Sequence, residues 1–301
     1  MFDSIDAVTH ALRQTGYIAD RALATTVFLA GRLGKPILAE GPAGVGKTEL
    51  AKAVASALGT DLIRLQCYEG LDEAKTLYEW KYAKQLLYTQ LLRDHIDAVI
   101  GGATSLADAV ERIASEQDAF FSDRFLQERP LLQAIRADRQ TVLLIDEVDR
   151  AEDELEAFFL EVLAEFQVTV PELGTLRARH RPFVVLTSNN TRELSDALRR
   201  RCLHLWMDYP SAAREAEILQ ARVPEIGAQL AGQVADFVHK LRALDLKKAP
   251  SISETIDWAR ALTVLATEQL GEDVVRDTLN VLLKYEGDRE AAEEKLGSML
   301  E

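Results

Sequence analysis

Short apolar runs alternate with amphipathic stretches along the first two thirds of the chain. Five of these runs predict strands, at 36–39, 61–67, 141–147, 182–189 and 202–207. The run at 141–147 is apolar without alternation, which is typical of a parallel strand that is buried on both faces. Because amphipathic stretches of helical period separate the runs, the pattern predicts an α/β domain with a parallel sheet.

The stretches between the strands predict several helices and one hairpin. Apolar residues at helical spacing predict helix over 4–33, over most of 71–115 and over 152–166. The sequence GGATS at 101–105 interrupts the second of these stretches. Residues 167–178 alternate about a Pro–Gly turn and predict a small hairpin inserted into the α/β domain.

The pattern changes after the sequence DYPS at 208–211. No further strand is predicted beyond this point, and residues 211–301 carry helical periodicity throughout. We therefore expect two domains, an α/β domain over 1–210 and a smaller all-helical domain over 211–301.

Composition narrows the class of protein. The 301 residues are 48% hydrophobic and 28% charged, which is typical of a soluble globular chain with a sizeable core. No apolar run approaches the roughly 18 residues that span a bilayer, and the N-terminus lacks the pattern of a signal peptide. Cys67 and Cys202 lie in apolar surroundings without metal-type spacing, so we expect a reduced, cytoplasmic protein. The net charge of −14 argues against nucleic acid as the main partner.

A glycine-rich segment between the first strand and the next helix predicts a phosphate-binding loop. GPAGVGKT matches G-x-x-x-x-G-K-[ST] in full and follows an apolar strand. Glycines let successive N–H groups converge on phosphates, Lys47 reaches the β- and γ-phosphates, and Thr48 ligates Mg²⁺. The predicted nucleotide-binding residues are Gly41, Pro42, Ala43, Gly44, Val45, Gly46, Lys47, Thr48 and Glu49.

Polar residues follow two of the later predicted strands. Asp146 and Glu147 end the apolar run TVLLIDE, at the edge where α/β sheets bind ligands. We expect Asp146 to support Mg²⁺ beside Thr48 and Glu147 to polarise an attacking water. Asp149 is expected to be a helix N-cap or an intersubunit contact. Asn189, after the strand FVVLTS, is placed to orient the same water.

The order of these motifs resembles that of AAA+ ATPases. GPAGVGKT, LLIDE and LTSN precede an arginine cluster, a short strand and an all-helical lid, and the resemblance covers essentially the whole chain. The segments DRFLQERPLLQAI and QVTVPELGTLRARHRPFVVLTSN look like the MoxR group. CYEGLDEAKTLYEWKYAKQLL looks like the subgroup that accompanies carbon monoxide dehydrogenase maturation (CoxD-like).

This resemblance implies roles for further residues. It implies that Arg201, with Arg200 as the alternative, is an arginine finger and that Asn189 is sensor 1. Tyr17 and Ile18 match the position at which the family packs adenine. Arg199 is interpreted as a cation at a helix C-terminus, where the helix dipole favours it.

The family also implies an activity and partners. MoxR proteins form hexameric rings that bind ATP and Mg²⁺ between subunits. They remodel client metalloenzymes or help to insert their cofactors, often with a partner that carries a von Willebrand factor A domain. Two alternatives remain open from the residues, a DNA-dependent motor or loader and an ATP-binding switch with little turnover.

One position departs from the family pattern. AAA+ proteins commonly carry an Arg or Lys in the first turn of a lid helix, as sensor 2. The corresponding stretch PSISETIDWAR offers Ser253 and Glu254 instead, and an acid there would repel phosphate. Either this lid lacks the cation, or Arg260 or Lys248 replaces it.

Overall fold

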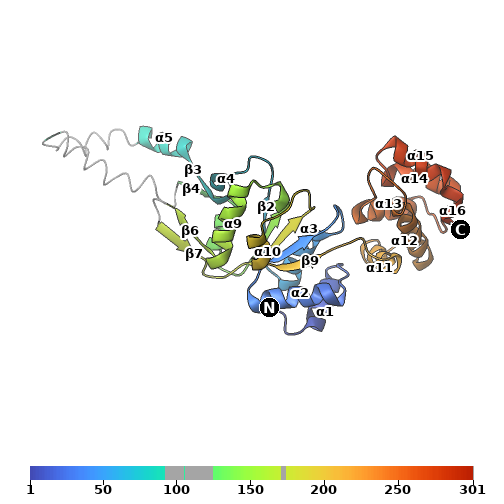
Figure 1. The fold of residues 1–301 in the computed structure, drawn as a ribbon, viewed down its shortest axis with the longest axis horizontal. Coiled ribbons are helices and arrows are strands. Elements are labelled where there is room, and N and C mark those ends of the chain that lie inside the picture. Colours follow the sequence, from blue (N-terminus) through green and yellow to red (C-terminus); the bar gives the residue numbers. More distant parts are fainter. Residues whose placement is uncertain (92–104, 106–124, 171–173, 301) are drawn as a thin grey trace.

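The computed structural model describes residues 1–91, 105, 125–170 and 174–300. Most of the predicted GGATS interruption and of the segment after it lies outside these residues. Two bodies are visible in Figure 1, one built on a sheet and one made of helices, joined by the chain that follows β9. Among the described residues, no helix has the length and apolar character needed to cross a membrane.

The sheet confirms the predicted α/β class. Its five strands pair in the order β2-β5-β8-β1-β9, and every pair is parallel. The strands are β1 (Ile37–Glu40), β2 (Leu62–Gln66), β5 (Val142–Asp146), β8 (Phe183–Ser188) and β9 (Leu203–Trp206). Four of them lie within a predicted apolar run, and β1 extends one residue beyond its run, to Glu40. Because all run the same way, their carboxyl ends form one edge of the sheet.

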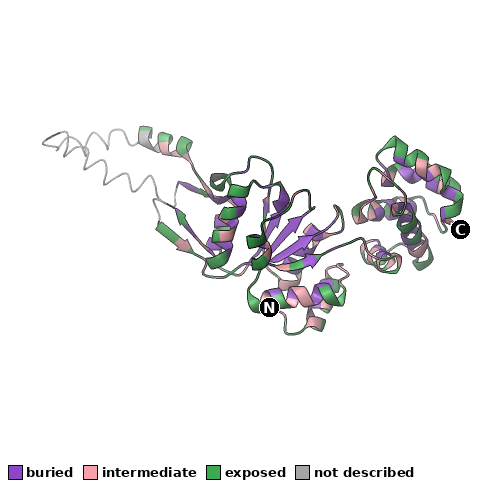
Figure 2. Cartoon of the chain, viewed as in Figure 1, coloured by how far each residue is buried: buried purple, intermediate pink, exposed green. Residues whose placement is uncertain are grey.

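Helices cover both faces of this sheet. One face packs on α1 (Ile5–Gln14), α2 (Arg21–Leu33) and α3 (Lys47–Leu58), and the other on α8 (Pro130–Arg136), α9 (Asp153–Glu165) and α10 (Asp196–Arg201). Within β1, Ile37 and Ala39 face the first group while Leu38 faces the second, as strand alternation requires. Figure 2 shows the buried strands between the two layers.

The N-terminal helix prediction is wrong in one respect, since residues 4–33 form two helices. The chain turns between α1 and α2, where Gly16 has a φ of 77°. Asp20 then caps α2, because its side chain accepts a hydrogen bond of 2.7 Å from the Leu23 amide. Apolar spacing alone did not reveal this break, which exposes a short loop beside the phosphate-binding loop.

The segment predicted as mostly helical also contains a strand. Two short helices, α4 (Glu73–Leu77) and α5 (Tyr82–Leu91), flank β3 (Tyr78–Trp80), which pairs antiparallel with β4 (Leu126–Glu128). Three-residue strands are too short for a periodicity, and their pairing joins residues far apart in sequence. Farther along, β6 (Gln167–Val170) pairs antiparallel with β7 (Gly174–Arg177).

The remaining helices form a body with its own core. They are α11 (Ala212–Arg222), α12 (Ala228–Arg242), α13 (Ile252–Val264), α14 (Glu272–Leu282), α15 (Glu286–Glu294) and α16 (Leu296–Leu300). Trp258 lies at the centre, fully buried, with its Nε1 donating to Thr278 at 2.8 Å. A buried ion pair between Arg242 and Glu215 joins α12 to α11. These helices thus bury a hydrophobic core of their own, separate from the two clusters that flank the sheet.

Candidate nucleotide site

The phosphate-binding loop connects β1 to α3 at the carboxyl edge of the sheet. Gly41, Gly44 and Gly46 all have positive φ, of 148°, 79° and 94°. A Cβ on Gly41 would lie 1.8 Å from the Met207 carbonyl oxygen. Glycine is therefore required here both by backbone conformation and by the close approach of the chain after β9.

Lys47 is held inside this loop. Its side chain is almost completely buried, and its ammonium donates to the carbonyl oxygens of Gly41 at 2.7 Å and Pro42 at 2.6 Å. Burial lowers the pKa of Lys47, while the nearby carboxylates of Asp149 and Asp146 act in the opposite direction. The loop thus presents a desolvated cation within a glycine cradle, which fits the phosphates of a nucleotide.

Asp146 lies beside Thr48, as predicted. Its carboxylate is 2% exposed, and its Oδ1 accepts hydrogen bonds from Thr48 at 2.9 Å and from Thr187 at 2.6 Å. Its Oδ2 accepts from Arg64, through Nη2 at 2.6 Å and Nε at 3.0 Å. A threonine hydroxyl and a carboxylate in contact are hard oxygen donors that suit Mg²⁺.

Glu147 follows at the end of β5 in a left-handed conformation, with a φ of 55°. Its amide donates to the Thr187 hydroxyl at 2.9 Å, and its carboxylate lies 3.4 Å from Arg150. This conformation is uncommon for a residue other than glycine, and it turns the chain so that Glu147 lines the same cavity as Lys47.

Asp149 does not cap a helix, so that alternative for this residue is wrong. It lies in the 3₁₀ turn Val148–Arg150 and is 3% exposed. Its carboxylate accepts a hydrogen bond from the backbone amide of Asn189 at 3.1 Å. It also accepts from the amide of Thr191 at 2.9 Å and from its hydroxyl at 2.7 Å. Asp149 therefore holds the loop after β8, and with it Asn189, against the end of β5.

Nine of the predicted residues line one cavity of about 260 Å³, and five of them carry the side chains expected to act on phosphate, metal and water. These five are Lys47, Thr48, Asp146, Glu147 and Asn189, and they come from three different elements of the sheet edge. Ser253, from the first turn of α13, lines the opposite wall. The arrangement brings an ammonium, a metal-type oxygen pair, a carboxylate and an amide around a common space.

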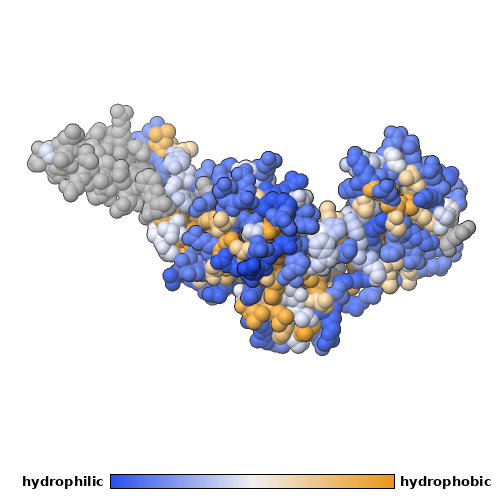
Figure 3. Space-filling view, in the orientation of Figure 1, coloured by the Kyte–Doolittle hydropathy of each residue, from blue (hydrophilic) through white to orange (hydrophobic). Residues whose placement is uncertain are grey.

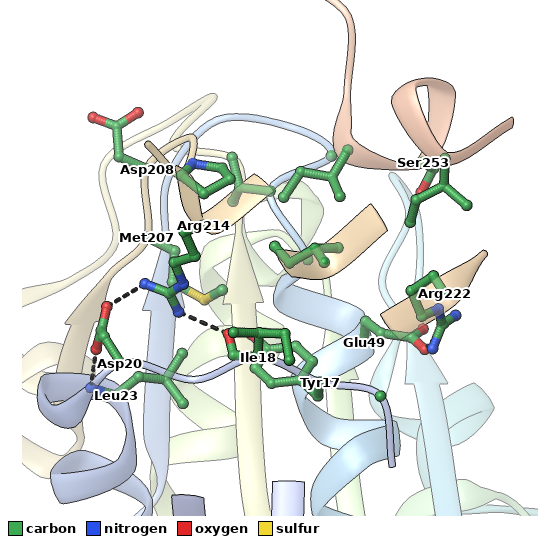
Figure 4. Close-up of a pocket in the computed structure, with 18 of the residues that line it drawn as sticks. Tyr17, Ile18, Asp20, Leu23, Glu49, Met207, Asp208, Arg214, Arg222 and Ser253 are labelled. Atoms are coloured by element: carbon green, nitrogen blue, oxygen red, sulfur yellow. Dashed lines mark hydrogen bonds and ion pairs between the residues drawn. The ribbon is translucent and has the colours of Figure 1, made fainter. Parts of the chain in front are cut away.

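A second cavity, of about 210 Å³, adjoins the first through Gly44 and Gly46. Tyr17 and Ile18 form part of its wall, together with side chains of β9, α11 and α13 (Figure 4). The added lining residues are largely apolar: Leu23, Val45, Leu205, Met207, Ile218, Ile252 and Ile256. Burial raises the pKa of the Tyr17 phenol. This cavity suits the flat base of a nucleotide whose phosphates bind the neighbouring loop.

Two arginines of α11 border this cavity, and the sequence had not pointed to them. Arg214 donates to Asp20 at 2.5 Å and to the carbonyl oxygen of Ile18 at 2.9 Å (Figure 4). Arg222 forms an ion pair with Glu49 at 3.2 Å. Both contacts connect α11 with the nucleotide-binding body, so the helical body closes one side of the site.

No Lys or Arg of the lid helix α13, which the structure describes in full, lines either cavity. Glu254 is held in a capping box, accepting from the Ser251 amide at 2.7 Å, and its carboxylate pairs with Lys248 at 3.2 Å. Arg260 pairs with Asp257 at 3.3 Å. Neither Lys248 nor Arg260 lines the two cavities, so the replacement that we had considered is not seen. The cap also turns the acid of Glu254 back onto its own helix.

The three consecutive arginines have different surroundings. Arg199 reaches the buried carboxylate of Glu40 at 3.1 Å, an ion pair that its place in the last turn of α10 did not reveal. Arg200 pairs with Asp196 at 3.7 Å, with both side chains more than four-fifths exposed. Arg201 is exposed and ends α10.

Arg201 lies at the amino ends of the strands, whereas the phosphate loop lies at their carboxyl ends. β9 starts two residues later, in register with the first residue of β1, and the Leu203 amide donates to the Pro36 carbonyl at 2.8 Å. A four-residue strand such as β1 spans roughly 13 Å. The backbone of Arg201 is therefore separated by the length of a strand from the loop that follows Glu40.

Comparison with known proteins also indicates a nucleotide-binding ATPase domain. The sequence profile of the ATPase family associated with various cellular activities (AAA) matches residues 37–207, more than half of the chain. An uncharacterized protein of Staphylococcus haemolyticus is 24% identical over 258 residues, which are 82% of this chain and 85% of that protein. The ATP-dependent zinc metalloprotease FtsH of Rhodothermus marinus is 31% identical over 150 residues, 41% of this chain and 21% of that protein.

Among solved structures, the RuvB Holliday junction branch migration motor of Thermotoga maritima has a TM-score of 0.48 at 18% identity. The match covers 97% of this chain and 76% of that one. The family match runs from β1 to the end of β9 and includes the phosphate loop and the acids of β5. The chain therefore belongs to the AAA ATPase family, and it is an ATP-hydrolysing enzyme of the P-loop class.

Proposed function

We propose that this protein is a MoxR-type AAA+ ATPase of the cytoplasm. In this proposal a hexameric ring uses ATP hydrolysis to remodel a client metalloenzyme or to assist its cofactor insertion. The observation that carries the ATPase part is the cavity where Lys47, Thr48, Asp146, Glu147 and Asn189 meet. We assign residues 1–210 to the nucleotide-binding domain and 211–301 to the lid.

The site residues have distinct tasks under this proposal. Lys47 and the loop amides bind the phosphates, and Thr48 with Asp146 would hold Mg²⁺, which supplies positive charge against the γ-phosphate. Glu147 accepts a proton from the attacking water, and the side-chain amide of Asn189 orients that water. Tyr17 and Ile18 would pack against the base.

The position of the arginine cluster supports assembly. Arg201 lies at the amino ends of the strands, far from the phosphate loop of its own chain. It is therefore suited to contact the nucleotide of a neighbouring subunit, with Arg200 as the alternative. Apolar side chains also gather over α1 and α2 in Figure 3, and Met1, Leu29 and Leu33 are exposed there. Such a patch is typical of a surface that another molecule covers.

The client role rests on the MoxR-like segments and on the β6–β7 hairpin, which this group uses to touch substrate. The partner with a von Willebrand factor A domain rests on the same resemblance. A gene for that partner or for a molybdenum hydroxylase beside this one would support both. A DNA-dependent motor is the competing function, although the charge of −14 disfavours it.

Steady-state phosphate release by wild type and Glu147→Gln, measured across protein concentration, tests the proposal. We expect turnover per chain to rise as rings form, and Glu147→Gln to bind ATP while losing at least about a hundredfold in turnover. Constant turnover in a strictly monomeric sample would refute the contribution of Arg201 from a neighbour. Equal inactivity of both proteins in assembled rings would favour an ATP-binding switch, and salt-sensitive stimulation by DNA would favour a motor.

A further inference from the structure

The carboxylate of Asp146 is shared between two sides of the site. Its Oδ1 faces the phosphate loop and accepts from Thr48 and Thr187. Its Oδ2 accepts from Arg64 of the neighbouring strand β2 through both Nη2 and Nε, and at 3.3 Å also from the Thr48 hydroxyl. The oxygen pair expected to support Mg²⁺ is thus already engaged by a guanidinium from its own chain.

The strand register explains how Arg64 reaches this carboxylate. Arg64 pairs with Leu144 and Gln66 pairs with Asp146, so the arginine lies two residues behind the carboxyl edge. Its side chain extends toward that edge and contacts the Gln66 side chain as well as Asp146. The guanidinium therefore lies along the sheet on the side of Asp146 away from the phosphate loop.

The two partners differ sharply in exposure. The side chain of Asp146 is 3% exposed, whereas that of Arg64 is 50% exposed. A buried carboxylate needs a counter-charge or it becomes strongly unfavourable. An arginine that is half in water loses little when it leaves an ion pair, because water solvates the released charge. The pair can therefore open at the arginine without exposing Asp146.

Lys47 does not meet the need for a counter-charge in this conformation. Its ammonium donates to the carbonyl oxygens of Gly41 and Pro42 rather than to Asp146. Among the described residues, the ion pair of Asp146 is the one with Arg64. The guanidinium is thus the positive charge in direct contact with the carboxylate before a divalent cation arrives.

We infer that Arg64 is a positioning residue that neutralises Asp146 in the metal-free protein and competes with Mg²⁺ for it. The inference rests on the proposed function, in which Thr48 and Asp146 hold Mg²⁺. Arg64 holds Asp146 in place when the site is empty of metal, and its positive charge weakens metal binding. Mg²⁺ arriving with nucleotide takes over the role of counter-ion, so Arg64 sets the Mg²⁺ concentration at which the site fills.

The test compares three substitutions. Arg64→Gln removes the charge and keeps an N–H donor for Oδ2, and Arg64→Lys keeps the charge without the planar fork. The matched control is Arg139→Gln, since Arg139 pairs with Asp61 at 2.7 Å at the start of the same strand, with both side chains about two-thirds exposed. Mg²⁺ is titrated into each protein with a fluorescent ADP analogue, and nucleotide affinity is read as a function of free Mg²⁺.

We expect Arg64→Gln to lower the half-saturating Mg²⁺ concentration about fivefold, the effect of one unit charge on a divalent cation at roughly 8 Å in water. Arg64→Lys and Arg139→Gln should stay within about twofold of wild type, since each leaves a positive charge beside Asp146. An unchanged or weaker Mg²⁺ affinity in Arg64→Gln overturns the inference. If wild type itself shows no Mg²⁺ dependence and Thr48→Val changes nothing, the metal assignment of the proposed function fails, and the inference fails with it.

A second measurement follows the metal-free state and does not use nucleotide. In EDTA, Arg64→Gln should melt at a lower temperature than Arg139→Gln, because it leaves a buried carboxylate without its counter-charge. The double variant Arg64→Gln/Asp146→Asn should recover most of this loss, since both charges are gone. Equal melting temperatures for the two single variants, or no recovery in the double variant, would contradict the neutralising role.

Discussion

The backbone amide of Ile252 donates a hydrogen bond of 3.1 Å to the carbonyl oxygen of Gly44, so the first turn of α13 rests on the phosphate loop. The Tyr209 hydroxyl, from the chain that leads into the lid, donates to the Ala43 carbonyl of the same loop at 3.2 Å. The lid therefore touches the nucleotide loop through the backbone of α13. A change in the loop should therefore be felt directly by the lid.

Gly44→Ala tests this contact. The new Cβ would lie 2.2 Å from the Cβ of Ser251, at a backbone φ of 79°. We expect α13 to be displaced and nucleotide affinity to fall at least about tenfold, which corresponds to about 1.4 kcal/mol. Affinity for a fluorescent nucleotide, measured by titration, checks this.

Gly59→Ala is the control for Gly44→Ala. Gly59 also has a positive φ, of 62°, but a Cβ there meets nothing within 4 Å. It should cost about 1–2 kcal/mol of stability through backbone strain alone and leave nucleotide affinity nearly unchanged. Equal losses of affinity in the two variants would show that strain, and not the lid contact, explains the effect.

Arg199→Ala should destabilise the fold. The Glu40 carboxylate is only 2% exposed, and it would retain His204 at 2.5 Å but lose Arg199. Because Arg199 is itself partly exposed, we expect a loss of about 2 kcal/mol in the free energy of unfolding. Arg200→Ala, at a fully solvated pair, should change it by less than about 0.5 kcal/mol. Urea unfolding of both variants measures these losses. Similar free energies of unfolding for the two variants would contradict the structural role of Arg199.

Mixing two inactive variants tests whether Arg201 serves a neighbouring subunit. Arg201→Ala alone should lose at least about a thousandfold in turnover, as arginine fingers do. Lys47→Ala should be inactive because it cannot bind the phosphates. In a mixed ring, the Lys47→Ala chain supplies Arg201 to an intact site on the other chain, so phosphate release should return. No recovery in mixed rings of verified composition would count against action in trans, and loss of activity in Arg200→Ala instead would move the role to that residue.

The two cysteines should resist alkylation in the folded protein. Burial raises the pKa of Cys67 to about 12, aided by the carboxylate of Asp146, and burial also raises the pKa of Cys202 to about 12. At pH 8 only about one thiol in ten thousand is then the reactive thiolate. Iodoacetamide labelling, followed by mass spectrometry, should be far slower in buffer than in urea. Rapid labelling of Cys67 in buffer would show that the end of β2 opens.

Local patterns were enough for the strands and for the phosphate loop. The three central strands of the sheet, β5, β8 and β1, are compact buried runs, since helices cover both faces of the sheet there. The motif from Gly41 to Thr48 is contiguous, so its conformation follows from the glycines and from the helix that begins at Lys47. Glu147 and Asn189 could be placed because they directly follow buried strands.

Contacts between distant segments were beyond the sequence. The β3–β4 pairing and the role of Asp149 were missed, because each depends on partners elsewhere in the fold. The break between α1 and α2 was missed although its signals, Gly16 and the Asp20 cap, are local. Asp149 illustrates the reason, since a carboxylate before a helix pattern looks like a cap. Only the position of the loop after β8 makes it an anchor for Asn189.

The sequence by itself determined the family and the α/β class, and it predicted the phosphate, metal and water residues of this protein, because those signals are local and contiguous. The tertiary structure alone decided which charges meet. Arg64 lies 82 residues from Asp146 in sequence, and the contact arises because β2 and β5 are neighbours in the sheet. The contact of α13 with Gly44 likewise depends on where the lid packs. The packing of whole elements sets such distances, and no short stretch of sequence encodes that packing.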